Sequence, residues 1–287
     1  MPRLIINADD LGLTSGVNRA IEEASRAGAI TSATLMANSQ AFAEAVETAK
    51  TLPGLKIGCH IVLIDGEPLC RGLSSLTNGT TKFESSLKDF ALAALRKRLS
   101  PDEIQREAVA QISKIQSAGI TVTHVDTHKH THIFPHVLAP ILKAAKACGI
   151  HAIRNPFEPF SAWPLGMIAS RPGLWTRAIE VALLQRFAGA FREKVRQEGM
   201  LTTNGAAGVI ATGSLNQRLL LATIHSLPEG TWELVCHPGY MDSDLSSVGT
   251  RLLESRRVEL DTLMSEATRQ ALAKHGINLV SYANLRE

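Results

Sequence analysis

The sequence predicts an α/β protein, a distorted TIM-like (β/α) barrel of about seven parallel strands that alternate with helices. Short apolar segments alternate with longer helix-like segments along all 287 residues, and the composition does not shift between the two halves of the chain. The number of strand-like segments is nearer to that of a closed or nearly closed barrel than to that of an open doubly wound sheet. No G-x-G-x-x-G motif follows the first strand, so the usual dinucleotide signal is absent. We therefore expect one domain over residues 1–287.

The first half of the chain shows this alternation most clearly. Apolar runs predict strands, and Ser or Thr caps with a following Gly or Pro predict where helices begin and end. Ser100-Pro101-Asp102-Glu103, for example, is a capping box with proline at the first helical position. A long loop, of the kind that is usually functional, is expected over residues 64–86. We expect strands at 4–7, 31–36, 56–63 and 121–126, and helices at 14–27, 41–52, 100–118 and 136–148.

The second half is less regular. After a short strand at 152–154, residues 155–205 contain several prolines and Trp163, and they interrupt the alternation before it resumes. The tryptophan could stack on a sugar or anchor the loop within the core. We expect further strands at 208–210, 232–236 and 278–281, and helices at 174–197, 214–226 and 250–274.

The composition excludes several classes of function. Basic residues are scattered and the formal net charge is +3, so the chain lacks the clustered positive surface of a nucleic-acid-binding protein. The four cysteines are widely spaced and form no C-x-x-C pair, which predicts reduced thiols and a cytoplasmic protein. We find neither a signal sequence nor an apolar run of about 18 residues, and we expect no transmembrane segment.

Residues 123–136 contain half of the ten histidines in the chain. Histidine is the commonest metal ligand and the side chain best suited to move protons near neutral pH. If the strand at 121–126 continues, its two-residue period places His124, Asp126 and His128 on one face. His128 is nearest the end of this strand and is the best candidate from the stretch. Asp126 could hold a ligand imidazole by a hydrogen bond, whereas His124 lies deeper and is expected to be structural.

Polar residues of catalytic types lie at the ends of five of the predicted strands. In β/α barrels the active site lies at the carboxyl ends of the strands, so these residues should meet. One carboxylate and two imidazoles suit a divalent metal ion that activates water, and the natural chemistry is hydrolysis of an amide or ester. Of two adjacent carboxylates, one could bind the cation while the other acts as a base. The residues at the strand ends are Asp9, Asp10, His60, Asp126, His128, Arg154 and His237.

Four motifs that carry these residues resemble the YdjC-like carbohydrate deacetylases, which include chitooligosaccharide and hopanoid-biosynthesis-associated deacetylases. Leu11 and Thr127 replace the Phe and Ser that are common in the family, and neither change affects a catalytic position. The resemblance covers most of the chain and is least distinct at about 155–210. The motifs, in chain order, are Asn7-Ala8-Asp9-Asp10-Leu11-Gly12-Leu13, Gly58-Cys59-His60-Ile61-Val62-Leu63, Thr123-His124-Val125-Asp126-Thr127-His128-Lys129-His130 and Cys236-His237-Pro238-Gly239.

The resemblance implies a polysaccharide-deacetylase-like barrel that binds one divalent metal ion, Zn²⁺ or Mg²⁺. It implies that Asp10, His60 and His128 are the metal ligands. Asp9 would be the general base for the water that the metal activates, and His237 the general acid for the leaving amine. Arg154 would orient Asp9 through a charge-assisted pair, and the supporting residues would be Asp126 and His130. The implied reaction is hydrolysis of the N-acetyl group of an amino sugar to acetate and a free amine.

Alternatives remain open for the substrate and for the class of protein. The sugar could be chitooligosaccharide-like or a lipid-linked N-acetylglucosamine, as in the hopanoid branch, and the segments at 64–86 and 155–210 are expected to select it. The strongly apolar helix near 174–195 could pack on the barrel, contact a homodimer partner or accept a lipid. Other metal-dependent barrel enzymes, such as an amidohydrolase or a sugar isomerase, fit the same residues. A metal-dependent carbohydrate-binding or metal-sequestering protein would bind the ion without turnover.

Overall fold

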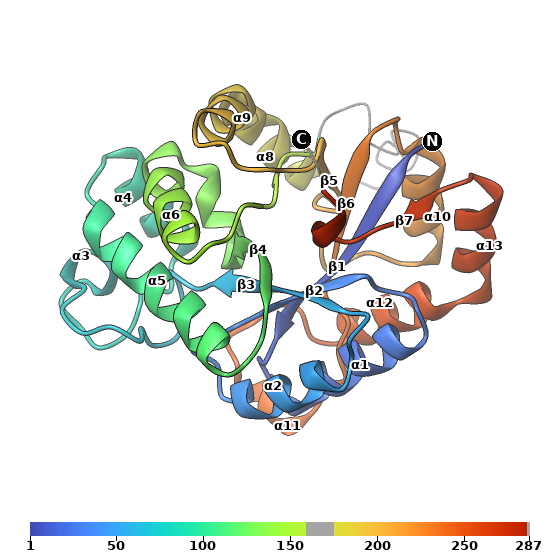
Figure 1. Cartoon of the computed structure of the whole chain (residues 1–287), viewed down its shortest axis with the longest axis horizontal. Coiled ribbons are helices and arrows are strands. Elements are labelled where there is room, and N and C mark those ends of the chain that lie inside the picture. The colour runs from blue at the N-terminus through green and yellow to red at the C-terminus, as the bar shows by residue number, and fades with distance from the viewer. Residues whose placement is uncertain (159–174, 286–287) are drawn as a thin grey trace.

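The computed structural model describes residues 1–158 and 175–285, and its strands form a parallel sheet that curves into a distorted barrel (Figure 1). Six strands follow the order β4-β3-β2-β1-β6-β5, and β7 pairs with the beginning of β1. All of the pairings are parallel, as predicted. The strands are β1 (Arg3–Leu11), β2 (Ser32–Leu35), β3 (Lys56–Ile61), β4 (Val122–Thr127), β5 (Gly205–Ala207), β6 (Thr231–Cys236) and β7 (Asn278–Leu279).

Residues 152–157 fill the gap between β4 and β5. Ile153 forms an isolated bridge with Val125 of β4, and Ala152 forms another with Leu201, just before β5. The amide of Ala206 in β5 then donates to the carbonyl of Phe157 at 2.9 Å. The predicted strand at 152–154 is therefore present as single bridges only. These contacts close most of the barrel, and the α/β parallel-barrel prediction is confirmed in this distorted form.

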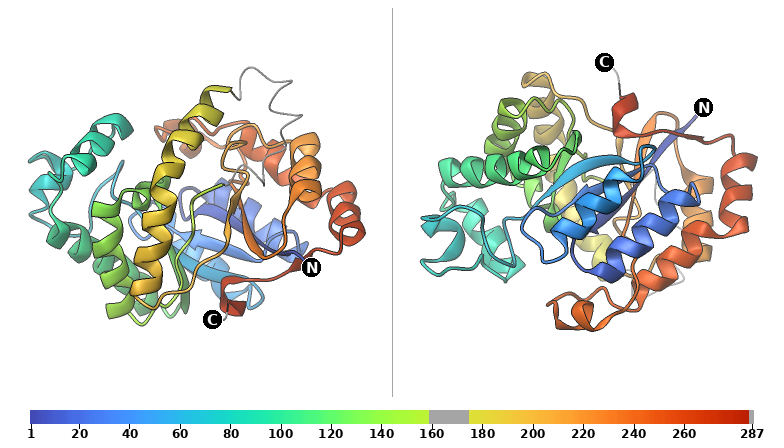
Figure 2. Two further views of the ribbon diagram at one scale, coloured as in Figure 1. Left: turned by 90° about the horizontal axis from the view of Figure 1, so that it is seen from above. Right: turned by 60° about the horizontal axis from the view of Figure 1, so that its bottom comes forward.

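Helices cover the outside of the strands (Figures 1 and 2). Two predicted N-caps are confirmed: Thr14 accepts the Val17 amide at 3.3 Å, and Ser100 accepts the Glu103 amide at 3.4 Å. The reciprocal half of the expected capping box is absent, because the Glu103 carboxylate accepts from Ser75 and the Ser100 amide donates to the Ser75 hydroxyl. Among the described residues, no helix combines the length and apolar character that a bilayer crossing requires. The α-helices are α1 (Ser15–Arg26), α2 (Phe42–Lys50), α3 (Ser74–Thr77), α4 (Leu87–Leu95), α5 (Pro101–Ser117), α6 (Pro135–Ala147), α8 (Trp175–Leu184), α9 (Ala188–Gln197), α10 (Gln217–Ser226), α11 (Ser243–Ser247), α12 (Ser255–Met264) and α13 (Glu266–Lys274).

Two predicted elements are wrong in their boundaries. The strand expected at 208–210 lies at 205–207, because Gly208 turns the chain with φ 86°. The buried Glu158 carboxylate then accepts the amides of Gly208 and Ile210 at 2.9 and 2.8 Å, so these amides cannot join a sheet. The helix expected at 250–274 is divided at Ser265, whose extended backbone ends α12 and whose hydroxyl caps α13.

Smaller differences concern the loops. The expected loop at 64–86 contains α3, and α4 follows it in a segment where no helix was predicted. The helix expected at 174–197 consists of α8 and α9 joined by a short 3₁₀ segment, η4 (Gln185–Phe187). Trp163 and the rest of 159–174 lie outside the described residues.

Gly58 of β3 lies in close contact with the ring of His124 on the neighbouring strand β4. The fully buried His124 ring stacks on Tyr282 at a centroid distance of 3.7 Å and an interplanar angle of 8°. A Cβ atom at Gly58 would lie only 2.5–2.7 Å from three atoms of the His124 ring. The structure thus assigns His124 a packing role, as its depth in the strand predicted.

Gly58→Ala should destabilise the protein by about 1–3 kcal/mol, because the His124 ring has no room to move away from the added methyl group. Chemical denaturation monitored by circular dichroism measures this change. Gly54→Ala is the matched control, since a Cβ atom there meets nothing within 4 Å, and it should change the free energy of unfolding by less than about 0.5 kcal/mol. Equal effects of the two substitutions would contradict the packing role.

Candidate metal centre

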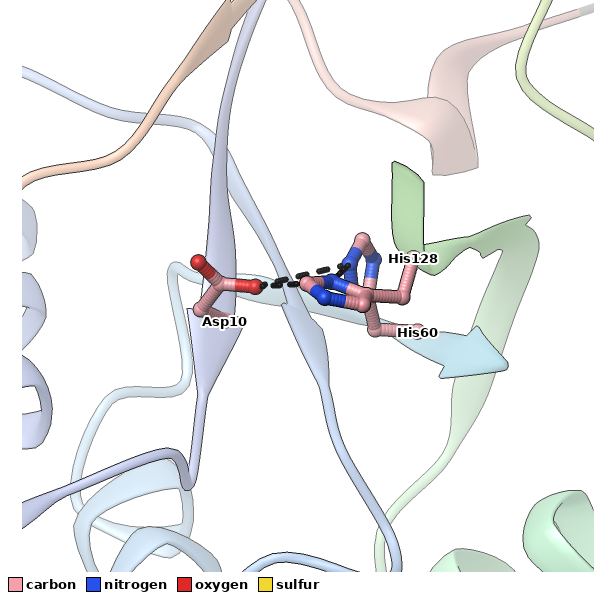
Figure 3. A group of neighbouring side chains, drawn as sticks. All are labelled: Asp10, His60 and His128. Atoms are coloured by element: carbon pink, nitrogen blue, oxygen red, sulfur yellow. Dashed lines mark hydrogen bonds and ion pairs between the residues drawn. The ribbon is translucent and has the colours of Figure 1, made fainter. Parts of the chain in front are cut away.

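The end of β1 supplies two adjacent carboxylates that point to different partners. Asp10 has φ 67°, in the left-handed region that few residues other than glycine, asparagine and aspartate enter readily. Because the chain turns at this residue, Asp9 lies among the residues around Arg154, whereas Asp10 faces two imidazoles (Figure 3). The expected division of the aspartate pair is therefore present in the geometry.

Asp10, His60 and His128 converge on one point at the carboxyl ends of β1, β3 and β4 (Figure 3). Asp10 Oδ1 lies 3.5 Å from both His60 Nε2 and His128 Nδ1, and these two nitrogens are 3.3 Å apart. Such separations are long for hydrogen bonds. Donor atoms that bind one ion tetrahedrally at about 2.0–2.1 Å lie about 3.3–3.4 Å from each other. The three residues therefore fit a divalent metal ion.

A second group of potential ligands, Asp9, His60 and Asp126, does not fit a metal in the same way. The Arg154 guanidinium donates to both oxygens of Asp9, at 2.8 and 2.6 Å, and forms an ion pair with Asp126. Positive charge is thus already present between these carboxylates. The residues expected as metal ligands are the ones that remain available for an ion.

Asp126 orients the imidazole of His60. His60 Nδ1 lies 2.8 Å from Asp126 Oδ1, so it acts as the donor and directs Nε2 at Asp10 and His128. Burial alone would lower the pKa of His60, but the charges of Asp126, Asp9 and Asp10 outweigh it and raise the pKa to about 9. The structure places Asp126 where the sequence predicted a supporting carboxylate.

Arg154 is fully buried at the centre of an ion network. Besides Asp9 and Asp126 it contacts Glu233, with Nε 2.9 Å and Nη2 2.7 Å from one carboxylate oxygen. Asp9 also accepts the side-chain amide of Asn7 at 2.9 Å. Burial would raise the pKa of Asp9, but the Arg154 charge and hydrogen bonds hold that pKa well below its usual range. Asp9 is therefore a fixed, ionised carboxylate beside the candidate metal centre.

His237 lies just after β6, with Nε2 3.8 Å from Asp9 Oδ2. Its backbone amide donates to the Glu259 carboxylate at 2.6 Å. Burial lowers the pKa of His237 to about 4, despite the opposing charges of Asp9 and Asp10, so the ring is neutral near pH 7. A neutral imidazole must gain a proton before it can act as a general acid.

The remaining histidines of the 123–136 stretch divide into two kinds. His132 contacts Thr127 and the Arg154 carbonyl, and His136 bonds the Leu99 carbonyl at 2.8 Å, so both hold the backbone in place. His130 is different, because its backbone is left-handed with φ 53° and its buried Nδ1 has no hydrogen-bond partner among the described residues. Strained backbone and an unpaired polar atom are features of functional sites.

The sequence did not indicate three residues that complete the site. Glu233 stands inside an apolar strand, and this exception to the pattern could have identified it. Arg256 donates to Asp10 Oδ2 at 2.6 Å, and Glu259 binds the His237 amide, yet both belong to a charged helix whose pattern is typical of a solvent-facing one. No local signal distinguishes them from their exposed neighbours.

The fold and the site together define a parallel (β/α)-barrel protein with a candidate metal centre at the carboxyl ends of its strands. The chain belongs to the YdjC-like protein family, whose model matches residues 3–274. It is 31% identical over 284 residues to a carbohydrate deacetylase of Brevibacillus brevis, covering 99% of both chains. It is also 31% identical to a carbohydrate deacetylase of Geobacillus stearothermophilus, covering 98% of both chains.

Two solved structures share the fold. A proposed cellobiose-phosphate cleavage protein from Enterococcus faecalis superposes with a TM-score of 0.77 at 22% identity, covering 98% of this chain and 97% of that one. A lactam utilization protein from Thermus thermophilus gives a TM-score of 0.50 at 14% identity, covering 97% of this chain and 99% of that one. At these identities the similarity establishes the fold alone.

Metal binding should release about one proton from His60. Because the pKa of this ring is about 9 in the metal-free protein, an ion at Nε2 must displace a proton at neutral pH, and the apparent Zn²⁺ affinity should rise about tenfold per pH unit from 6.5 to 8. Calorimetry in two buffers of different ionisation enthalpy counts the protons. Asp126→Asn removes the largest charge that raises this pKa and should reduce the release at pH 8. An affinity independent of pH over this range would contradict the assignment.

Proposed function

We propose that this protein is a metal-dependent carbohydrate deacetylase, which hydrolyses the N-acetyl group of an amino sugar to acetate and a free amine. The observation that carries the proposal is the pairing of two sites on one barrel rim. The donor atoms of Asp10, His60 and His128 lie 3.3–3.5 Å from one another, a spacing that suits ligands of one ion. Asp9, the residue next to Asp10, offers a second carboxylate that Arg154 holds separately. The relatives named carbohydrate deacetylase match this chain over nearly their full length, and they support the same activity.

Asp10, His60 and His128 would hold the ion. Two imidazoles and one carboxylate favour Zn²⁺ over Mg²⁺, which prefers an all-oxygen shell. When bound, such an ion lowers the pKa of water and stabilises the negative charge that develops on the carbonyl oxygen.

Asp9 and His237 would move the proton. Arg154 fixes both oxygens of Asp9, which takes a proton from the attacking water as the water oxygen bonds to the carbonyl carbon. A carboxylate whose pKa is held so low is a weak base, so the proton should pass on to the neutral ring of His237, 3.8 Å away. His237 would then protonate the amide nitrogen as the carbon–nitrogen bond breaks, which yields acetate and the free amine.

The exposed face of α8 favours a lipid-linked amino sugar as a second candidate substrate. Trp175, Ile179 and Leu183 are spaced four residues apart on this helix and are 52%, 61% and 54% exposed. Such a stripe could lie along an acyl or polycyclic chain and would place the protein in the hopanoid-associated branch. A homodimer contact is the other explanation of the same stripe.

An acetate-release screen on the Zn²⁺-loaded protein tests the proposal. Chitobiose, N-acetylglucosamine and a lipid-linked N-acetylglucosamine should be compared, with ammonia and isomerised sugar measured alongside. Acetate from at least one of these sugars is expected. Ammonia release or sugar isomerisation would indicate another metal-dependent barrel enzyme, and bound metal without turnover would indicate a binding protein. Equal turnover of chitobiose and the lipid-linked sugar would count against the hopanoid branch.

Asp9→Asn and Asp10→Asn should separate the roles of the two aspartates. Asp9→Asn should retain about one metal ion per chain and lose at least about 100-fold in turnover, because it removes the proton acceptor but no ligand. Asp10→Asn should lose most of its metal. Metal analysis after dialysis, together with acetate release, measures both effects. If Asp9→Asn were the variant that lost its metal, the two roles would be reversed.

A further inference from the structure

Helix α12 carries two buried charged side chains, Arg256 and Glu259, that contact different parts of the candidate site. They are three residues apart and therefore share one face of the helix. Arg256 donates to Asp10 Oδ2 at 2.6 Å and to the Leu252 carbonyl at 3.0 Å. Glu259 accepts the His237 amide at 2.6 Å. One helix outside the barrel thus reaches both the end of β1 and the end of β6.

Arg256 gives the two oxygens of Asp10 different surroundings. It binds Oδ2, while Oδ1 faces His60 and His128 at 3.5 Å each. The carboxylate plane is thereby fixed with a single oxygen directed at the point where the imidazoles converge. The second bond of Arg256, to the Leu252 carbonyl, fixes the guanidinium in turn. The planar fork of arginine provides this geometry, which the compact charge of lysine does not.

Glu259 lies on the other side of His237, where it accepts the backbone amide. The Nδ1 atom of His237 has no hydrogen-bond partner among the described residues and lies 3.9 Å from the Glu259 carboxylate, while Nε2 lies 3.8 Å from Asp9. The ring therefore stands between two carboxylates, with Nε2 on the side of the proposed base. The charges of Asp9, Asp10, Arg256 and His60 also act on this ring, and Glu259 faces its Nδ1 atom.

Close packing links the two contacts. A Cβ atom at Gly239 would lie 2.8 Å from Arg256 Cδ, and the Gly239 amide donates to the Arg256 carbonyl at 3.3 Å. The His237-Pro238-Gly239 segment therefore lies directly on Arg256. A displacement of this side chain would disturb the metal ligand and the proton donor together.

We propose that Arg256 and Glu259 are positioning residues, of which Arg256 restricts Asp10 to binding the metal through one oxygen and Glu259 fixes the ring of His237 toward Asp9. The inference rests on the proposed function, because it assigns these residues to the same metal centre. Their effects should differ: Arg256 acts on the metal coordination, and Glu259 acts on turnover without changing the coordination.

The visible absorption of the Co²⁺-loaded protein tests the role of Arg256, because it reports the number and geometry of the ligands and needs no substrate. Arg256→Lys keeps the buried charge and should fold, bind about one Co²⁺ per chain and show a changed spectrum, with kcat about 10–100-fold lower. Arg257→Lys is the matched control, since that side chain is 54% exposed and pairs with Asp261, and its spectrum should be that of the wild type. A folded Arg256→Lys protein with the wild-type spectrum would overturn the role of Arg256.

Glu259→Gln tests the proposed role of Glu259. At pH 8, above the pKa of about 7 that burial gives the Glu259 carboxyl, glutamine can still accept the His237 amide but carries no charge toward Nδ1. We expect kcat to fall at least about tenfold at this pH, while KM and the Co²⁺ spectrum stay near their wild-type values. Glu266→Gln, on the exposed start of α13, is the control that should change none of them. An unchanged kcat in Glu259→Gln would overturn the role of Glu259. If the wild type bound Co²⁺ but released no acetate, only the proposed reaction would fail, and the spectra would still decide the role of Arg256.

Discussion

The burial of Arg154 is the constraint on which the rest of the site depends. A guanidinium without access to water is stable only if carboxylates surround it, and here Asp9, Asp126 and Glu233 do so from three strands. Each of these carboxylates has a second partner: Asn7 donates to Asp9, His60 to Asp126 and Tyr282 to Glu233. The network therefore links β1, β4, β6 and the C-terminal segment through the interior of the barrel.

This network also explains why two adjacent aspartates behave differently. Arg154 engages both oxygens of Asp9, whereas Arg256 engages one oxygen of Asp10 and leaves the other facing His60 and His128. The left-handed backbone at Asp10 keeps both side chains inside the site, since two successive residues of a regular strand would point to opposite faces. A turn at the end of one strand thus gives two carboxylates of the same type two different environments.

The sequence predicts the inner part of this arrangement better than the outer part. Strand ends can be found from apolar runs, and the polar residues that follow them, from Asp9 to His237, do meet at one rim. The outer residues Arg256 and Glu259 come from a helix whose charges resemble those of any solvent-facing helix, so only their contacts with Asp10 and His237 reveal them. The predicted boundaries of β5 were wrong for a related reason. The Gly208 and Ile210 amides donate to Glu158, a side chain that is distant in the sequence.

The balance of charge favours binding of a cation at this site, independently of the donor distances. The interior of the site contains the carboxylates of Asp9, Asp10, Asp126, Glu233 and Glu259, against the two guanidinium groups of Arg154 and Arg256. Burial disfavours the charged form of the Glu259 carboxyl and raises its pKa to about 7. Burial would lower the pKa of His60, but the charges of Asp126, Asp9 and Asp10 raise it to about 9, so without metal this ring is an imidazolium. A divalent ion at Asp10, His60 and His128 would replace that proton with a larger positive charge. The same electrostatics would then retain the metal and release the proton.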